Sequence, residues 1–230
     1  MLAAFITLKR AFILTLAIFD LDNTLIGGDS DHAWGQFLVE NNYVDTESYE
    51  RQNDAFYEDY KAGTLDIIAY QEFALAPLAQ YSPDELASMH QQFIKTKIEP
   101  ILLDKAAALI QHHRDSGHQL LIITATNRFI TQPIATLLGI DQLIATDGEM
   151  IDGKYTGKVS GVPSFAEGKI TRLNQWLAVR EESLEGSFFY SDSHNDLPLL
   201  ETVSHPIAVD PDPTLERIAK ERDWQVISLR

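Results

Sequence analysis

Three short apolar runs lie far apart along the chain, and each ends in acidic or small polar residues. They are LTLAIFD, which ends at Asp20, QLLIITAT over residues 119–126, and SFFYSDS over residues 187–193. Continuous apolar runs of this length are typical of strands that are buried on both faces of a parallel sheet. LIAT (143–146) and HPIAVD (205–210) are weaker runs of the same kind. We therefore predict a set of parallel strands, the first over residues 14–19.

Helical patterns lie between these runs. Residues 104–117 carry apolar side chains at helical spacing and end in Gly117, a residue type that often closes a helix. We expect His112 and His113 on the solvated face of this helix. Residues 166–179 have the same periodicity. Strands that alternate with helices predict a doubly wound α/β fold, in which helices cover both faces of a parallel sheet. MIDGKYTG (150–157) predicts a small hairpin about its Asp-Gly pair.

One long segment, residues 29–99, breaks the alternation. It is helical in period, contains no convincing apolar strand, and holds fourteen Asp or Glu against four Lys or Arg. Its position between the first two strands predicts a helical cap inserted into the core and folded over the strand ends. Residues 1–28 and 100–230 then form the core domain. We expect Trp34 and the tyrosines and phenylalanines of the insertion to form the core of the cap rather than a cage for a substrate.

Composition narrows the class of protein. A chain of 230 residues that is 45% hydrophobic and 23% charged fits one large globular domain or a core plus an insertion. The formal net charge of −16 repels nucleic acid and anionic membrane surfaces, so we expect neither as a partner. The absence of cysteine excludes disulfides and thiolate metal sites and suits the cytoplasm. The sequence carries no signal for an oligomeric state.

The N-terminal region superficially resembles a secretory signal, because Lys9 and Arg10 precede an apolar run of nine residues. That run is too short to span a membrane. No small-residue cleavage site follows it, and cleavage there would remove the strand that carries Asp20. We therefore interpret the run as a core strand and expect a cytoplasmic protein. Residues 1–10 are an extension to which the sequence assigns no role.

Four groups of polar residues lie at the ends of predicted strands or at the start of a predicted helix. In chain order they are Asp20 with Asp22, Thr124, Lys169, and the stretch SDSHND, which contains Asp192 and Asp196. We expect them to meet, because ligands of such sheets bind at the carboxyl ends of the strands. Clustered carboxylates are costly without a cation, and oxygen ligands favour Mg²⁺. A carboxylate beside Mg²⁺ can attack phosphorus, while Lys169 and the Thr124 hydroxyl can neutralise the phosphoryl oxygens. Asp22 can protonate the leaving alkoxide and then activate water.

These motifs resemble those of the haloacid dehalogenase superfamily. DLDNT after an apolar strand, Thr124 at a strand end, Lys169 at a helix start and DSHND after another strand match its four motifs in order, over nearly the whole chain. The resemblance implies a phosphatase with Asp20 as the nucleophile. It implies Asp22 as the acid and base, since dehalogenases of the superfamily lack that acid.

The same resemblance implies a site for Mg²⁺. Its ligands would be Asp20, the backbone carbonyl of Asp22, and Asp192. Asp196 and Asn195 would support the metal site.

The position and sequence of the insertion resemble a narrower branch of the superfamily. A helical insertion directly after the first motif is similar to the cap of phosphoserine-phosphatase-like proteins. GGDSDHAWGQFL and TATNRFITQPIA look like a bacterial group within that branch that includes histidinol-phosphate phosphatases. Asp29 stands where that branch places a cap acid that meets the substrate amine, although a plain loop acid is an equal alternative. Asn127 and Arg128 come just after the second motif. We expect their side chains either beside the phosphate and leaving group or in solvent.

The acidic insertion predicts the charge of the substrate. It favours a cation next to the phosphate and disfavours an additional carboxylate. A carboxylate would require an arginine partner, and Arg51 is the only arginine of the insertion. Histidinol phosphate carries an amine and an imidazole and no carboxylate, whereas phosphoserine carries both an amine and a carboxylate. We expect a small phosphorylated metabolite that bears an amine, such as histidinol phosphate, with phosphoserine or a broad range of metabolites as the alternative.

A signalling receiver module is the alternative from outside the enzymes. Such modules also place a phosphate-accepting aspartate, further acids, a Thr or Ser and a Lys on a doubly wound sheet. They carry no large helical insertion and need no acid at the position of Asp22. Both features of this chain therefore favour the phosphatase.

Overall fold

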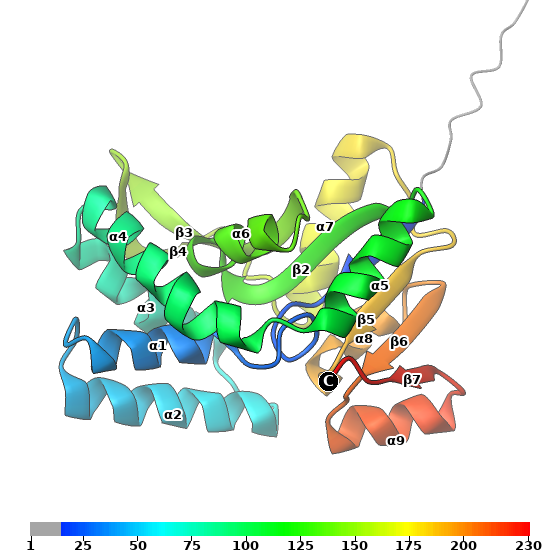
Figure 1. The fold of residues 1–230 in the computed structure, drawn as a ribbon, viewed down its shortest axis with the longest axis horizontal. Coiled ribbons are helices and arrows are strands. Elements are labelled where there is room, and N and C mark those ends of the chain that lie inside the picture. The colour runs from blue at the N-terminus through cyan, green and yellow to red at the C-terminus, as the bar shows by residue number, and fades with distance from the viewer. Residues whose placement is uncertain (1–14) are drawn as a thin grey trace, which may run out of the picture.

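A sheet of seven strands forms the centre of the computed structural model, which describes residues 15–230 (Figure 1). The strand order across the sheet is β4-β3-β2-β1-β5-β6-β7. The strands are β1 (Leu16–Phe19), β2 (Gln119–Asn127), β3 (Gln142–Ile151), β4 (Lys154–Ser160), β5 (Phe188–Ser191), β6 (His205–Val209) and β7 (Gln225–Ile227). All neighbours are parallel except β3 and β4. The predicted α/β fold with a parallel sheet is confirmed.

Five of these strands cover the predicted apolar runs. The first expected strand included residue 14, and this residue and the N-terminal extension, residues 1–10, lie outside the described part of the chain. Two strands carry no apolar run of their own. β4 is the return strand of a hairpin and β7 is a short edge strand that is mostly exposed, so neither needs a continuous apolar sequence.

The hairpin between β3 and β4 turns at the predicted pair, Asp152 and Gly153. Ile151 pairs with Lys154, which leaves only these two residues in the loop. Their φ angles are 49° and 78°, and a two-residue loop with both φ angles positive matches the right-handed twist of the strands. The hairpin prediction is confirmed, although its strands extend farther than residues 150–157.

Helices cover both faces of the sheet. Those outside the insertion are α5 (Asp104–Asp115), α6 (Arg128–Leu137), α7 (Glu167–Arg180), α8 (Leu197–Leu200) and α9 (Pro213–Glu221). Successive β1 residues belong to different apolar clusters, with Phe19 on the side of α5 and α6 and Ile18 on the side of α7 and α9. None of the helices in the described part of the chain has the length and apolar run that crossing a membrane requires.

The insertion folds as four α-helices that share the core of the sheet. They are α1 (Ser30–Glu40), α2 (Thr46–Ala62), α3 (Ile67–Leu75) and α4 (Pro83–Phe93), and α1 and α2 lie side by side (Figure 1). Trp34 is 1% exposed and packs edge-to-face against Phe93 and Phe129. The same apolar cluster includes Phe19 of β1. Trp34 is therefore a core residue, as predicted, but its core is continuous with that of the sheet.

The prediction for His113 was wrong. His112 is exposed, but His113 is buried, with Nε2 2.8 Å from the Tyr190 hydroxyl. His113 shares a helix face with Ala106 and Ile110, at the spacing of seven and three residues that aligns side chains along a helix. This spacing places the imidazole against the sheet rather than in solvent.

Candidate active site

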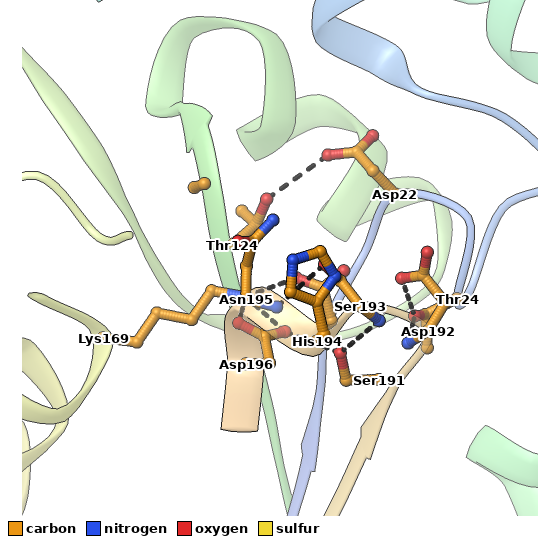
Figure 2. Close-up of polar contacts among 12 residues, drawn as sticks. Asp22, Thr24, Thr124, Lys169, Ser191, Asp192, Ser193, His194, Asn195 and Asp196 are labelled. Atoms are coloured by element: carbon orange, nitrogen blue, oxygen red, sulfur yellow. Dashed lines mark hydrogen bonds and ion pairs between the residues drawn. The ribbon is translucent and has the colours of Figure 1, made fainter. Parts of the chain in front are cut away.

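The candidate site lies at the carboxyl edge of the sheet, where the connections from β1 and β5 diverge. These two strands are neighbours, but the chain visits β2, β3 and β4 between them, and such a switch in strand order opens a crevice for ligands. Asp20 follows β1, Asp192 follows β5, and Thr124 lies within the last residues of β2. Figure 2 shows Asp22, Thr124, Lys169 and the loop after β5 around this edge.

Lys169 joins two carboxylates at the floor of the site. Its Nζ donates to Asp20 Oδ1 at 2.7 Å and to Asp196 Oδ2 at 2.8 Å. All three residues are at least 95% buried. Burial lowers the pKa of Lys169, but the charges of Asp196 and Asp20 outweigh it and raise that pKa, so the ammonium stays charged. Burial raises the pKa of Asp20, an effect that the charge of Lys169 opposes.

Gly168 allows α7 to begin close enough to place Lys169 in the site. A Cβ at this position would overlap with the carbonyl oxygen of Pro163. Ala166, the residue before α7, has a φ of 46°, an uncommon value for a residue with a side chain. The tight turn into α7 therefore depends on a missing side chain at one position and a strained backbone at another.

Asp22 is held by donors from two elements. Its Oδ1 accepts from the backbone N–H of Ser30 at 2.6 Å. Its Oδ2 accepts from the Thr126 hydroxyl at 2.9 Å and from the Thr124 hydroxyl at 3.4 Å. Burial raises the pKa of Asp22, and the hydrogen bonds from Ser30 and Thr126 oppose that rise. Thr124 lies where it was expected, and Thr126 is a contact that the sequence analysis missed, although two residues apart on a strand point to the same face.

Asp192 and Asp196 are each supported by a hydroxyl group. The Thr24 hydroxyl donates to Asp192 Oδ1 at 3.0 Å (Figure 2), and the Ser191 hydroxyl donates to Asp196 Oδ2 at 2.7 Å. Burial raises the pKa of Asp192 to about 7, with a further contribution from the charge of Asp196 and an opposing hydrogen bond from Thr24. The charge of Asp192 in turn raises the pKa of Asp20.

This donor set fits a hard divalent cation. Asp20 and Asp192 are crowded carboxylates that burial and mutual repulsion penalise, and a cation between them would relieve both costs. Within residues 15–230, no group of three or more His, Cys, Asp or Glu side chains is arranged to hold a metal. A site built from Asp20, Asp192 and the backbone carbonyl of Asp22 would use only two such side chains, so it needs no group of three.

Asn195 connects the site to the insertion. Its Nδ2 donates to the backbone carbonyl of Tyr60 at 3.3 Å, near the C-terminal end of α2. α2 ends at Gly63, where φ is 70° and a Cβ would lie only 2.9 Å from His194 Nε2. The insertion therefore closes directly onto the loop after β5.

A cavity lies between the sheet edge and the insertion. Five aspartates line it, together with Lys169: Asp20, Asp22, Asp29, Asp31 and Asp196. Aromatic side chains form much of its remaining wall: Phe56, Tyr57, Tyr60, Tyr70 and Phe165. The four aromatic residues that come from the insertion were expected in the core of the cap, and that prediction was wrong for them.

Asp29 lines this cavity and also caps α1. Its Oδ1 accepts from the backbone N–H groups of Asp31 at 3.0 Å and His32 at 2.8 Å. Burial raises its pKa to about 7, with a further contribution from the charge of Asp22 and opposing hydrogen bonds from the two N–H groups. Both of these hydrogen bonds go to the same carboxylate oxygen, Oδ1.

Asn127 and Arg128 do not line the cavity. Asn127 is buried and caps α6, accepting from the N–H of Ile130 at 3.3 Å. Arg128 Nε donates to Asp147 Oδ1 at 2.6 Å, so the carboxylate of this β3 residue neutralises the guanidinium. The end of β2 and the start of α6 direct both side chains away from the cavity, so of the two alternatives a place beside the phosphate and leaving group is not supported.

Among residues 15–230, Lys169 is the only cationic side chain on the cavity wall, and Asp20 and Asp196 already accept hydrogen bonds from it. Arg51 is exposed on α2 and does not reach the cavity. In the described part of the chain, the cavity wall therefore offers an incoming carboxylate no cationic side chain that is not already paired.

The chain matches one family model and several known proteins over most of its length. The family model of haloacid dehalogenase-like hydrolases matches residues 17–201. The chain is 52% identical to a histidinol-phosphatase of Neisseria meningitidis over 219 residues, which is 94% of this chain and 99% of that protein. It is 33% identical to a phosphoserine phosphatase of Mycobacterium tuberculosis over 93% of this chain and 70% of that protein.

Solved structures show the same fold. A protein of unknown function from Bordetella pertussis Tohama I has a TM-score of 0.89 and 46% identity, over 94% of this chain and 99% of that chain. A phosphoserine phosphatase that carries an analogue of the phospho-aspartyl intermediate has a TM-score of 0.69 and 17% identity, over 94% of each chain. The second likeness concerns the fold alone.

Proposed function

This chain belongs to the haloacid dehalogenase-like hydrolases and is a phosphatase, and we propose that it hydrolyses histidinol phosphate with Mg²⁺ through an aspartyl-phosphate on Asp20. The charge of the cavity is the observation that carries the choice of substrate. Five aspartates and one already paired lysine line it, which favours a phosphomonoester with basic nitrogens and no carboxylate. The relative named histidinol-phosphatase supports the same choice.

Asp20 is the proposed nucleophile. Lys169 orients it through the 2.7 Å hydrogen bond and brings a positive charge next to the phosphoryl group. The Thr124 hydroxyl lines the same cavity and can donate to a phosphoryl oxygen. Attack of the Asp20 carboxylate on phosphorus forms the acyl-phosphate and breaks the bond to the substrate alkoxide.

Asp22 is the proposed acid and base. A raised pKa keeps its carboxyl group protonated for longer as the pH rises, so it can give a proton to the leaving alkoxide. The resulting carboxylate then takes a proton from the water that attacks the acyl-phosphate. Thr126 and the backbone of Ser30 hold the carboxyl group in place during both steps.

Mg²⁺ would be held by Asp20, Asp192 and the backbone carbonyl of Asp22. When bound, it would neutralise charge on the phosphoryl oxygens and on the crowded carboxylates. Thr24 fixes the Asp192 carboxylate, and Asn195 and Asp196 support the loop that carries it.

We also propose that residues 29–99 act as the cap and residues 1–28 and 100–230 as the core. Three helices of the insertion contribute to the cavity wall: Asp29 caps α1, and α2 and α3 supply four of the aromatic side chains. Opening of this segment would admit the substrate, and closure would exclude water from the acyl-phosphate. Asp29 would meet the substrate amine.

Phosphate release from a small panel tests the substrate. The panel contains histidinol phosphate, phosphoserine, phosphorylcholine, a sugar phosphate and a nucleotide, each with Mg²⁺, and Asp20→Asn is the control. We expect one strong preference, for histidinol phosphate, and no release by the variant. Faster turnover of phosphoserine than of histidinol phosphate would overturn the substrate proposal. A stable acyl-phosphate without turnover would instead indicate a receiver-like module.

A further inference from the structure

Asp31 is an acid of the cavity wall to which the proposed reaction gives no role. The residue is 5% exposed and lines the same cavity as Asp20 and Asp29. Both of its carboxylate oxygens are buried without a hydrogen-bond partner. Among residues 15–230, no other carboxylate has both oxygens in this state.

The start of α1 explains why Asp31 has no backbone donor. Acids in the first turn of a helix usually accept hydrogen bonds from its free N–H groups. Here the N–H of Ser30 donates to Asp22, and the N–H groups of Asp31 and His32 donate to Asp29. None of these three donors is left for the Asp31 carboxylate.

The neighbours of Asp31 compensate its carboxylate only in part. Burial, followed by the charges of Asp29 and Asp22, raises its pKa well above the usual value. The Tyr70 hydroxyl is near enough to oppose that rise but makes no hydrogen bond of normal geometry with it. A buried carboxylate without a donor is costly, and a cationic N–H group in the cavity would remove that cost. Aromatic faces such as Phe56 also favour a cation.

We propose that Asp31 determines specificity by accepting a hydrogen bond from a second cationic nitrogen of the substrate, distinct from the amine that Asp29 meets. The inference rests on the proposed function and narrows the substrate to small phosphomonoesters with two basic nitrogens. The charge balance of the wall favours two nitrogens over one. Lys169 is occupied by Asp20 and Asp196, so a single ammonium, even one that bridged Asp29 and Asp31, would balance only one of their two negative charges.

Steady-state kinetics with two matched substrates test this role. Histidinol phosphate carries an amine and an imidazole, and phosphoethanolamine carries the amine alone. We expect Asp31→Asn to lower kcat/KM for histidinol phosphate by about 30-fold or more, mainly through a higher KM. The same variant should change kcat/KM for phosphoethanolamine by less than about threefold. Asp84→Asn removes the same charge from an exposed position of α4 and should change neither. Circular dichroism and thermal unfolding verify that each variant is folded.

Binding of histidinol, the dephosphorylated alcohol, gives a readout without turnover. Calorimetry should show binding to the wild-type protein and at least about 30-fold weaker binding to Asp31→Asn and Asp31→Ala. Equal losses for both phosphate esters, or unchanged histidinol binding in the variants, would overturn the role of Asp31. If the wild-type protein binds histidinol through Asp31 but fails to hydrolyse its phosphate, the proposed function fails and the subsite stands. If it hydrolyses histidinol phosphate and Asp31→Asn does so equally well, the function stands and the subsite fails.

Discussion

Lys169 Nζ lies 2.7 Å from Asp20 Oδ1 although 149 residues separate them in sequence. The same ammonium donates to Asp196, so one buried cation serves two buried carboxylates. The arrangement orients the proposed nucleophile, and it makes the stability of the site depend on Lys169.

Lys169→Met should abolish activity and destabilise the protein. Removal of one partner from a buried ion pair leaves uncompensated charge and typically costs about 3–5 kcal/mol. We expect a loss of this size in urea unfolding and a fall in kcat of at least about 100-fold. The double variant Lys169→Met, Asp196→Asn should recover part of the stability, because one fewer carboxylate is left unpaired, without recovering activity. Wild-type turnover by Lys169→Met would contradict the role of the ammonium.

Asp22→Asn should separate the two chemical steps. p-Nitrophenol leaves without a proton, so attack by Asp20 can still occur in this variant, whereas activation of water is lost. Rapid mixing with p-nitrophenyl phosphate should give a burst of about one p-nitrophenol per enzyme, followed by slow turnover. Asp20→Asn should give no burst. A variant of Asp22 that turns over at the wild-type rate without a burst would exclude this residue as the base.

Asp192→Asn should raise the concentration of Mg²⁺ needed for activity. The change removes a negative charge from the proposed metal site but keeps an oxygen that can accept from the Thr24 hydroxyl. We expect EDTA to abolish wild-type activity and excess Mg²⁺ to restore it. The half-saturating Mg²⁺ concentration should rise at least about tenfold in the variant. Full activity of the wild-type protein in EDTA would rule out the metal requirement.

His113 should make the protein less stable as the pH falls below 6.5. Burial, with smaller contributions from His118 and His112, lowers its pKa from 6.5 to about 4. Between pH 6.5 and about pH 4, the imidazole therefore binds a proton in the unfolded chain but not in the folded protein. Over this pH range the free energy of unfolding falls by up to about 1.4 kcal/mol per pH unit. His113→Gln should lose less stability than the wild-type protein between pH 7 and pH 5 in thermal unfolding. His112→Gln changes an exposed neighbour and should follow the wild-type protein.

Gly35→Ala should loosen the contact between α1 and α2. A Cβ at position 35 would overlap with the amide group of Asn53, which is buried and donates to the backbone carbonyl of His32 at 3.1 Å. Overpacking of this kind typically costs about 1–3 kcal/mol. We expect such a loss in urea unfolding, although alanine favours helices more than glycine does. In the Gly35→Ala background, Asn53→Ala should lower the free energy of unfolding by less than it does in the wild-type protein, because the overlap is removed. Equal losses in the two backgrounds would exclude the overlap.

The sequence by itself determined the sheet and the proposed chemistry. Apolar runs long enough only for strands, each followed by acids or hydroxyls, predicted both the parallel strands and the edge where their polar ends meet. The order of the motifs placed Asp20, Asp22, Thr124, Lys169 and Asp192 at that edge, and the structure brings them together there. These features follow from local pattern and from the geometry that all parallel sheets share.

Only the tertiary structure decided which side chains face the cavity. Arg128 is paired with Asp147 of β3, and His113 is turned against the sheet. Asp31 lies in the first turn of α1, where the free backbone N–H groups donate to Asp22 and Asp29 instead. Each outcome depends on a partner from a distant segment or on competition for a single hydrogen bond. A periodic pattern shows which face of an element is apolar, but it does not show which partner a polar group will find.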